Sequence, residues 1–570
     1  MRKILLFFFT VLFVSEFTTF AQVKDVEDEA AIVYDKSESS RHSNQEAVEA
    51  WMDRRFGLFV HWGPSATTGN NHSHARKSEL NHGGNLPAEE YDKLYKSFNP
   101  IKFDAEEWAD MAYNAGMRYI VFTTKHHDGF SVFSSDATDY DMDATPYGKD
   151  VLKEIADAFH KRDMGFGLYY SPRDWYHPDY NKGSHDKYNE FYIQQMTELA
   201  SNYGQIDIFW FDGTNPAGES KWKGTLQKVG DMLYEKHPQI MCNDRAGFPG
   251  NFETFEQRNG YYNLEEPWET CMTITTAGWI HMNKRTLRPY RELLRHLVYT
   301  AGRNGNYLLN LGPTKEGIFD PEHVARLNEI GNWMKVNKES ILETRGGPFL
   351  DGTWGTSTRK NNNIYLIVTE HPGEILKLPP IDAKIKKAEA LAGGKIEFEQ
   401  DKNGIEFKIP LAQRDSVATA IKLTIDKPAM ELKAIRVQKN LAEGAKLTAS
   451  NVLNGDMEKY GPQNAVDNSF ETIWETENDA MEVSMEVDFG EPKLISAASI
   501  TQYAGWYPES VELQVLVNNK WKKVYSARSK VTQLPIIEFE PLNTEKVKLI
   551  ITKRRNPFPS SINDFRIFAP

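Results

Sequence analysis

Between about residues 50 and 345, short continuous apolar runs alternate with segments whose apolar positions recur at helical spacing. The runs that predict strands cover residues 56–60, 119–124, 165–170, 206–211, 239–242 and 307–311. The periodic segments that predict helices cover residues 151–159, 188–203, 226–236, 291–300 and 324–334. Two further signals mark helix starts: Asp104 lies three residues before Glu107, as in a capping box, and Pro321 suits a first helical position.

Strands that are apolar along their whole length indicate a parallel sheet covered by helices. Enough strand–helix units fit in this stretch to close a (β/α)8-like TIM barrel. The rival, an open doubly wound sheet, would normally carry a glycine-rich phosphate loop after its first strand. His61-Trp-Gly-Pro64 stands there instead, which favours the barrel.

The pattern changes after about residue 345. Short alternating runs, such as 363–368 and 404–409, are separated by Gly, Pro and Asn turns, which is typical of an antiparallel β-sandwich. A second all-β segment follows, with runs at 485–489, 510–517 and 546–551. We therefore predict a multidomain chain whose parts are a barrel over residues 22–345, a β-sandwich over 346–440 and a C-terminal β-sandwich over 441–570.

Polar and aromatic residues gather at the carboxyl ends of the predicted barrel strands, where the reactive groups of such barrels stand. They are His61, Trp62, Lys125, His126, His127, Asp128, Tyr170, Arg173, Trp175, Trp210, Asp212, Asn243, Asp244 and Arg245. A barrel needs no polar groups there for stability, so the set indicates a ligand site. Asp212 lies between an apolar strand and Gly213, which suits a positioned nucleophile, although a helix cap or a loop ion pair would also explain it.

His126 and His127 allow a metal-dependent alternative. Adjacent strand residues point to opposite faces, so both reach one ion only if the strand has already ended. A second pair, His72 and His74, lies in a loop rich in Ser, Asn and Gly. Neutral imidazoles that bind ligand hydroxyls fit better, a purely structural pair is the other possibility, and we predict no metal and no organic cofactor.

Hydrolysis with retention of configuration requires a second carboxyl group about 5 Å from the nucleophile. The candidates that follow Arg245 are Glu253, Glu256, Glu265, Glu266 and Glu269. Sequence spacing does not measure that distance, and most of these side chains are expected to be surface charges.

Composition narrows the class of ligand. Aromatic residues make up 12% of the 570 residues, which suits a sugar-binding cleft as well as a core. The net charge of −13 argues against a nucleic-acid partner. The two cysteines, Cys242 and Cys271, cannot build a disulfide scaffold; we expect two buried thiols, with a single bridge as the alternative.

The N-terminus has the pattern of a signal peptide. Arg2 and Lys3 precede a short apolar run over residues 4–14, and Ala21 offers a small residue for cleavage. We therefore expect residues 1–21 to be removed and the protein to be exported to the periplasm, the medium or the cell surface. A retained N-terminal anchor is the alternative, and no later stretch predicts a transmembrane span.

Several motifs together resemble family 29 of the glycoside hydrolases, the α-L-fucosidases. They are Phe56-Gly-Leu-Phe-Val-His-Trp-Gly63, Tyr91-Asp-Lys-Leu-Tyr-Lys-Ser-Phe-Asn-Pro100, Thr124-Lys-His-His-Asp-Gly-Phe130, Tyr169-Tyr-Ser-Pro172, Trp210-Phe-Asp-Gly213, Pro267-Trp-Glu-Thr-Cys-Met-Thr273 and Gly305-Asn-Tyr-Leu-Leu-Asn-Leu-Gly-Pro313. The resemblance covers roughly residues 48–345. It implies an exo-acting retaining hydrolase that removes terminal α-L-fucose through a covalent fucosyl-enzyme.

The resemblance also implies residue roles. Asp212 matches the nucleophile. The positions that match contacts to fucose are His61, Trp62, His126, His127, Tyr170, Trp210, Arg245 and Trp279. Many similar members carry Thr-Pro-Glu-Gln where this chain has Thr254-Phe-Glu-Gln257, so Glu256 is the favoured acid/base and Glu269 the alternative.

The segment 441–570 resembles a discoidin-like, jelly-roll carbohydrate-binding module of family 32. Its marks are Ala465-Val-Asp-Asn468, Trp474, Val487-Asp-Phe-Gly490 and Ile562-Asn-Asp-Phe-Arg-Ile567. The partners implied are fucosylated oligosaccharides or glycoconjugates. Two other classes stay open from the residues alone: a fucose-binding protein without turnover, and a metal-dependent barrel hydrolase.

Overall fold

The computed structural model describes residues 45–570, apart from 70–72, 80, 182–183, 214–218, 277, 284, 371–372, 468–471, 478–481, 503–507, 528–535 and 555–559. The predicted signal peptide, residues 1–21, lies outside the described residues. Among the residues described, none of the helices combines the length and the apolar character that a bilayer crossing requires.

Eight parallel strands form the first domain. They are β1 (Phe56–Val60), β4 (Tyr119–Lys125), β5 (Gly165–Tyr170), β6 (Ile208–Phe211), β7 (Met241–Cys242), β8 (Glu253–Glu256), β9 (Trp268–Thr273) and β10 (Asn306–Leu311). Their order in the sheet is β7-β6-β5-β4-β1-β10-β9-β8. A parallel bridge between Asn243 and Phe252 joins the two edge strands β7 and β8, so the sheet curls round on itself as the predicted barrel requires.

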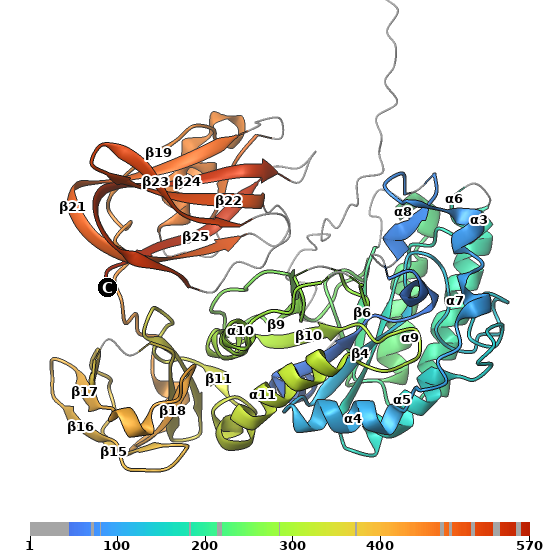
Figure 1. The fold of residues 1–570 in the computed structure, drawn as a ribbon, viewed down its shortest axis with the longest axis horizontal. Helices are drawn as coiled ribbons and strands as arrows, with labels where there is room; N and C mark the ends of the chain where they lie inside the picture. The colour runs from blue at the N-terminus through green and yellow to red at the C-terminus, as the bar shows by residue number, and fades with distance from the viewer. Residues whose placement is uncertain are drawn as a thin grey trace, which may run out of the picture.

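Helices cover the outside of this sheet (Figure 1). The longer ones are α4 (Ala105–Asn114), α5 (Val151–His160), α7 (His185–Asn202), α9 (Thr225–Lys236), α10 (Tyr290–Gly302) and α11 (Pro321–Asn337); α2 (Gln45–Arg54) precedes β1, and the short helices are α3 (Ala88–Tyr91), α6 (Pro178–Asn181) and α8 (Glu219–Trp222). The Asp104 carboxylate accepts the backbone N–H of Glu107 at 3.1 Å, which confirms the predicted N-cap of α4. The predicted helices all form, with ends that differ by a few residues.

Two barrel strands, β8 and β9, were not predicted as strands. Within the described residues, no helix lies between β7 and β8 or between β8 and β9, so the alternation that revealed the other strands is missing there. Strand β8 also begins and ends with glutamate, which hides its apolar character. The barrel is therefore thinner on this side than a full (β/α)8 ring.

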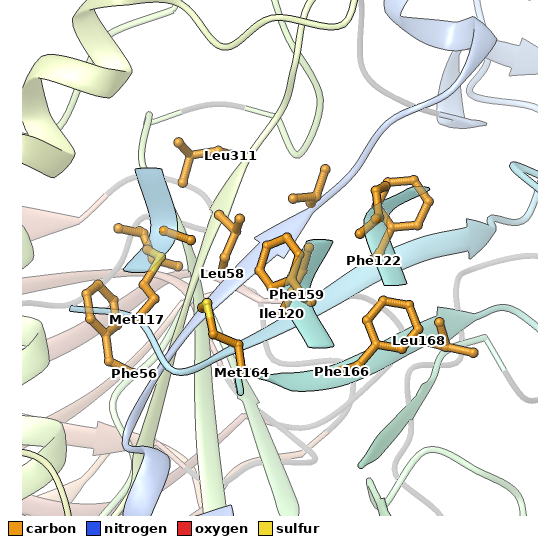
Figure 2. Packing of buried hydrophobic residues seen from close by; sticks show 14 of the residues in the cluster. Phe56, Leu58, Met117, Ile120, Phe122, Phe159, Met164, Phe166, Leu168 and Leu311 are labelled. Atoms are coloured by element: carbon orange, nitrogen blue, oxygen red, sulfur yellow. The ribbon is translucent and has the colours of Figure 1, made fainter. Parts of the chain in front are cut away.

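The strand side chains alternate between two environments. Outward-facing residues pack against the helices in one large core, which includes Leu58, Ile120, Phe122, Phe166 and Leu168 (Figure 2). Inward-facing residues form a separate cluster inside the barrel, which includes Phe59, Val121, Tyr169, Ile208, Trp210 and Leu308. This alternation decides which side of each strand end faces the barrel interior.

The rest of the chain forms antiparallel sheets, as predicted. The middle domain has a five-stranded sheet, β11 (Arg345–Gly346), β12 (Gly355–Lys360), β13 (Asn363–Val368), β18 (Thr419–Ile425) and β15 (Ile385–Ala390), and a three-stranded sheet, β14 (Ile375–Leu378), β17 (Ile405–Lys408) and β16 (Glu397–Gln400). The last domain has β19 (Lys446–Ala449), β20 (Trp474–Glu475), β21 (Val483–Gln502), β22 (Pro508–Val517), β23 (Lys520–Ala527), β24 (Ile537–Arg554) and β25 (Ser561–Phe568) in one sheet. Cys242 and Cys271 are both free and buried.

Both β domains lie on the side of the barrel that carries α10 and α11 (Figure 1). Three apolar residues of the last domain, Ala497, Ile536 and Phe568, belong to the same core cluster as the barrel. The polar counterpart of this contact is Asp351 of the middle domain. It accepts from Arg303 of the barrel at 2.7 Å and from Arg566 of the last domain at 3.1 Å, so it joins all three domains.

Replacement of Asp351 should weaken the contact between the three domains. Burial raises the pKa of Asp351, but Arg303 and Arg566 together hold it well below its ordinary value. We expect Asp351→Asn to lower the free energy of unfolding at pH 7 by about 3–5 kcal/mol, because it leaves two buried guanidinium groups without their partner. Denaturant unfolding measures this.

The difference between wild type and Asp351→Asn should narrow as the pH falls below about 4, because a carboxylate with a depressed folded-state pKa loses its contribution as it is protonated. Asp382→Asn, whose side chain is 98% exposed, is the matched control and should unfold like the wild type. Equal stability of both variants at pH 7 would show that Asp351 does not hold the junction.

Candidate functional site

A pocket of about 260 Å³ opens at the carboxyl ends of the barrel strands. Its walls are Phe59, His61, His74, His126, His127, Tyr169, Trp210, Asp212, Arg245, Glu256, Gln257, Thr273, Thr276, Gly278, Trp279 and Arg288. Of the residues singled out from the sequence, the pocket brings together His61, His126, His127, Trp210, Asp212, Arg245, Glu256 and Trp279. It combines aromatic surfaces with a small number of converging charged groups, which is the usual make-up of a ligand site.

Asp212 stands at the end of β6 and is held by three donors. Tyr169 donates its hydroxyl to Oδ2 at 2.8 Å, and the backbone N–H of Gly213 donates to Oδ1 at 2.9 Å. Arg245 Nη1 donates to Oδ1 at 3.2 Å. Gly213 adopts φ +70°, and a Cβ there would lie 2.7 Å from the His127 ring, so the turn that exposes Asp212 requires glycine. These contacts fix the orientation in which the Asp212 carboxyl group faces the pocket.

Arg245 also contacts the second carboxylate of the pocket. Its Nη1 atom lies 3.1 Å from Glu256 Oε2, and its guanidinium lies over the Trp210 ring, 5.1 Å from the centroid. Because Asp212 and Glu256 contact the same nitrogen at 3.2 and 3.1 Å, their two nearest oxygens lie within roughly 6 Å of each other. The geometry therefore suits a nucleophile and an acid/base that act on one bond.

Two histidines are anchored through their Nδ1 atoms. His61 Nδ1 lies 2.7 Å from Asn310 Oδ1, and His127 Nδ1 lies 2.6 Å from Ser171 Oγ. Burial lowers the pKa of His61 to about 3, against the smaller opposing effect of Asn310. His61 is therefore a neutral imidazole at physiological pH.

His126, His127 and Asp212 also form a group that could hold a metal ion, since their ligand atoms all lie within 4.8 Å of one another. Within the described residues, this is the only such group. The Arg245 guanidinium beside Asp212 supplies the positive charge that an ion would otherwise bring. The donor set fits a ligand rich in hydroxyl groups better than a divalent cation.

Two residues expected to contact the ligand lie elsewhere. Trp62 packs among Phe98, Phe103 and Trp108 and donates its Nε1–H to the Thr314 carbonyl at 2.9 Å. Tyr170 faces the helices, and its hydroxyl donates to Gln195 at 2.7 Å. The neighbouring Tyr169 faces the pocket instead, because it pairs in register with Trp210, and paired residues share a face of the sheet.

Glu269, the alternative acid/base, is also outside the pocket. It lies at the start of β9, fully buried, and accepts from Tyr119 at 2.6 Å and from Trp210 Nε1 at 3.1 Å. Burial raises its pKa to about 8, although these two donors oppose the shift. Glu269 supports the Trp210 ring from within the barrel, and Glu256 is the glutamate that reaches the pocket.

Several pocket residues were not predicted. Phe59 and Tyr169 could have been found from strand parity, because they point to the same side as Trp210. The sequence shows His74 only as part of a loop motif. The centroid of its ring lies 5.7 Å from the centroids of the His127 and Trp175 rings. His72 lies outside the described residues. Arg288 and Thr276 follow β9, a strand that the sequence pattern did not show.

The unusual Phe255 has a structural explanation. Its ring is buried against Tyr261 and Trp268, so it faces away from the pocket while Glu256 faces in. Gln257 then adopts φ +52°, and its side chain donates to Thr273 at 3.0 Å. The chain turns sharply after Glu256, which fixes the place of that carboxyl group.

Comparison with known proteins relates the barrel to one enzyme family. The model of the alpha-L-fucosidase family matches residues 21–339, and the F5/8 type C domain model matches residues 446–563. Plasma alpha-L-fucosidase of Homo sapiens is 31% identical over 362 residues, covering 57% of this chain and 77% of its own length.

Solved structures give the same relationship. An alpha-L-fucosidase of Bacteroides thetaiotaomicron, crystallised as a trapped covalent intermediate with 2-fluoro-fucosyl fluoride in a glutamate-to-glutamine mutant, is 29% identical with a TM-score of 0.62, covering 68% of this chain and 97% of its own. An alpha-L-fucosidase of Vibrio sp. strain EJY3 shares the fold over 93% of this chain and 98% of its own, with a TM-score of 0.63 at 20% identity.

The buried position of Glu269 predicts a distinctive dependence of stability on pH. Its folded-state pKa of about 8 exceeds the ordinary glutamate value of about 4.3, so the unfolded chain releases this proton first. The contribution of Glu269 is therefore present below about pH 4 and is lost as the pH rises through 8.

As the pH rises from 4 to 8, the free energy of unfolding should fall less in Glu269→Gln than in the wild type, because the amide does not titrate. Denaturant unfolding at several pH values measures this free energy. The exposed Glu265→Gln is the control and should follow the wild type. Identical pH profiles for Glu269→Gln and wild type would contradict a protonated Glu269.

Proposed function

Because the chain belongs to the alpha-L-fucosidase family of glycoside hydrolases, we propose that it is an exo-acting, retaining α-L-fucosidase that releases terminal α-L-fucose from oligosaccharides or glycoconjugates. The observation that carries the proposal is the placement of Asp212 and Glu256 on the two sides of one Arg245 nitrogen. Two carboxyl groups that share one cation are close enough to act on the same glycosidic bond, as a retaining pair does.

In the first step, Asp212 attacks the anomeric carbon while Glu256 protonates the departing glycosidic oxygen. The product is a fucosyl ester on Asp212 and a free aglycone. In the second step, Glu256 takes a proton from water, the water attacks the anomeric carbon, and Asp212 leaves as a carboxylate. The trapped covalent intermediate of the Bacteroides relative, obtained with a glutamate-to-glutamine mutant, supports the same two-step division of roles.

Histidines, of which His61 is held neutral by burial, and aromatic rings surround the place of the sugar. We assign His61, His126 and His127 to the fucose hydroxyls, together with Arg245, and Trp279 to the apolar side of the ring. Tyr169 takes the place first given to Tyr170. A site built from buried polar groups rejects sugars that leave one of those groups unmatched.

Two segments outside the barrel bear on which glycans the protein binds and where it acts. The discoidin-like module at residues 446–563 supports binding to glycans beyond the terminal fucose. The basic and then apolar pattern of residues 1–21 supports export to the periplasm or the cell exterior.

Removal of either carboxylate tests the mechanism. We expect Asp212→Ala and Glu256→Gln to lower kcat for an aryl α-L-fucoside by at least about 1,000-fold, because each removes one partner of the covalent cycle. Glu253→Gln, on the same strand but offset by an odd number of residues, is the matched control and should keep wild-type turnover. Proton NMR should show α-L-fucose as the first product, and β-L-fucose would overturn retention.

Chelation separates this mechanism from metal-dependent hydrolysis. Because Arg245 rather than an ion neutralises the pocket carboxylates, we expect full activity after dialysis against EDTA. Activity lost with EDTA and restored by a divalent cation would favour the metal-dependent alternative. Fucose binding by calorimetry without turnover on any fucosylated oligosaccharide would favour a binding protein.

A further inference from the structure

His61 and Asn310 come from neighbouring strands and meet inside the barrel. Asn310 lies on β10, opposite Phe59 of β1, and is 2% exposed. Its Nδ2 donates to the backbone carbonyl of Trp279 at 2.6 Å, and its Oδ1 lies 2.7 Å from His61 Nδ1. One buried amide therefore contacts two residues of the pocket wall.

These contacts fix which nitrogen of His61 carries the proton. A carbonyl oxygen only accepts hydrogen bonds, so the amide nitrogen of Asn310 must face Trp279 and its oxygen must face His61. The amide oxygen is also only an acceptor, so Nδ1 of His61 must be the donor. In a neutral imidazole the other nitrogen, Nε2, then has a lone pair and accepts.

His127 has a different kind of partner, a serine hydroxyl. The Ser171 oxygen lies 2.6 Å from His127 Nδ1 and 3.0 Å from the Arg173 carbonyl, and a hydroxyl both donates and accepts. His127 Nε2 lies 3.8 Å from Asp212 Oδ2, which is too long for a hydrogen bond. The contacts therefore fix the tautomer of His61 and leave that of His127 to its hydroxyl partner.

We propose that Asn310 is a positioning residue that holds His61 in the Nδ1–H tautomer, so that His61 Nε2 accepts a hydrogen bond from a fucose hydroxyl. The inference rests on the proposed function for the identity of the sugar, but the tautomer is a property of the protein alone. Its consequence is specificity for a hydroxyl that donates, since an acceptor such as fluorine at the same position leaves Nε2 without a proton to bind.

Nitrogen NMR of protein labelled with 15N-histidine tests the tautomer without any turnover. The His61 signals are assigned by their loss in His61→Gln. We expect a protonated Nδ1 and an unprotonated Nε2 in the wild type. Asn310→Asp should keep this tautomer, because a carboxylate beside Nδ1 also accepts its proton, whereas Asn310→Leu should lose it. A protonated Nε2 in the wild type, or an unchanged tautomer in Asn310→Leu, would overturn the proposal.

Binding of L-fucose derivatives by calorimetry tests the consequence. Each ring hydroxyl is replaced in turn by fluorine or by hydrogen. At one position, we expect fluorine to weaken binding to the wild type by about tenfold or more, as much as hydrogen does. The weakening of binding by fluorine should be smaller in Asn310→Leu and unchanged in Asn310→Asp. Tolerance of fluorine at every position in the wild type would overturn the acceptor role.

A matched variant separates positioning from general stability. Asn306 lies on the same strand, is equally buried and donates to the Trp51 carbonyl at 2.9 Å, four residues from the pocket end. Asn306→Leu should lower the unfolding temperature without changing the His61 tautomer or the fluorine penalty. If Asn306→Leu changed the tautomer as Asn310→Leu does, the role of Asn310 would be structural and the proposal would fail. Absence of all fucosidase activity would instead contradict the proposed function and leave the tautomer result valid.

Discussion

The pocket depends on a guanidinium held between two buried carboxylates. Without Arg245, the Asp212 and Glu256 carboxylates would repel each other across a poorly solvated space. Arg245 reaches both because the sheet closes: the bridge between Asn243 and Phe252 brings the end of β7 beside the start of β8. The site therefore needs a closed barrel, because closure places one positive charge beside both carboxylates.

Much of this arrangement could be predicted from the sequence. The apolar runs with polar ends located six strands and placed His61, His126, Asp212 and Arg245 at one rim. The sequence of β5 alone does not show which of two adjacent tyrosines faces inward, and Tyr170 was expected where Tyr169 lies. Register with Trp210 in the next strand decides between them, and register depends on a tertiary pairing that a single sequence does not display.

The positions of Glu256 and Glu269 could not be predicted for a different reason. Glu256 is the last residue of β8, whereas Glu269 is the second residue of β9, so one glutamate reaches the pocket and the other lies deep in the barrel. Neither strand stood out in the hydrophobic pattern, because in the described chain no helix separates β7 from β8 or β8 from β9. Depth along a strand cannot be assigned until the strand itself is known.

The shared apolar contact between the barrel and the last domain has a practical meaning. Ala497, Ile536 and Phe568 complete a core that starts in the barrel, and Arg295 of α10 pairs with Glu538 of β24 at 3.0 Å. A chain cut before residue 441 would uncover this seam to water and leave Arg295 with one acidic partner fewer. The discoidin-like module therefore covers part of the barrel core, and a chain shortened to its catalytic portion is expected to be prone to aggregation.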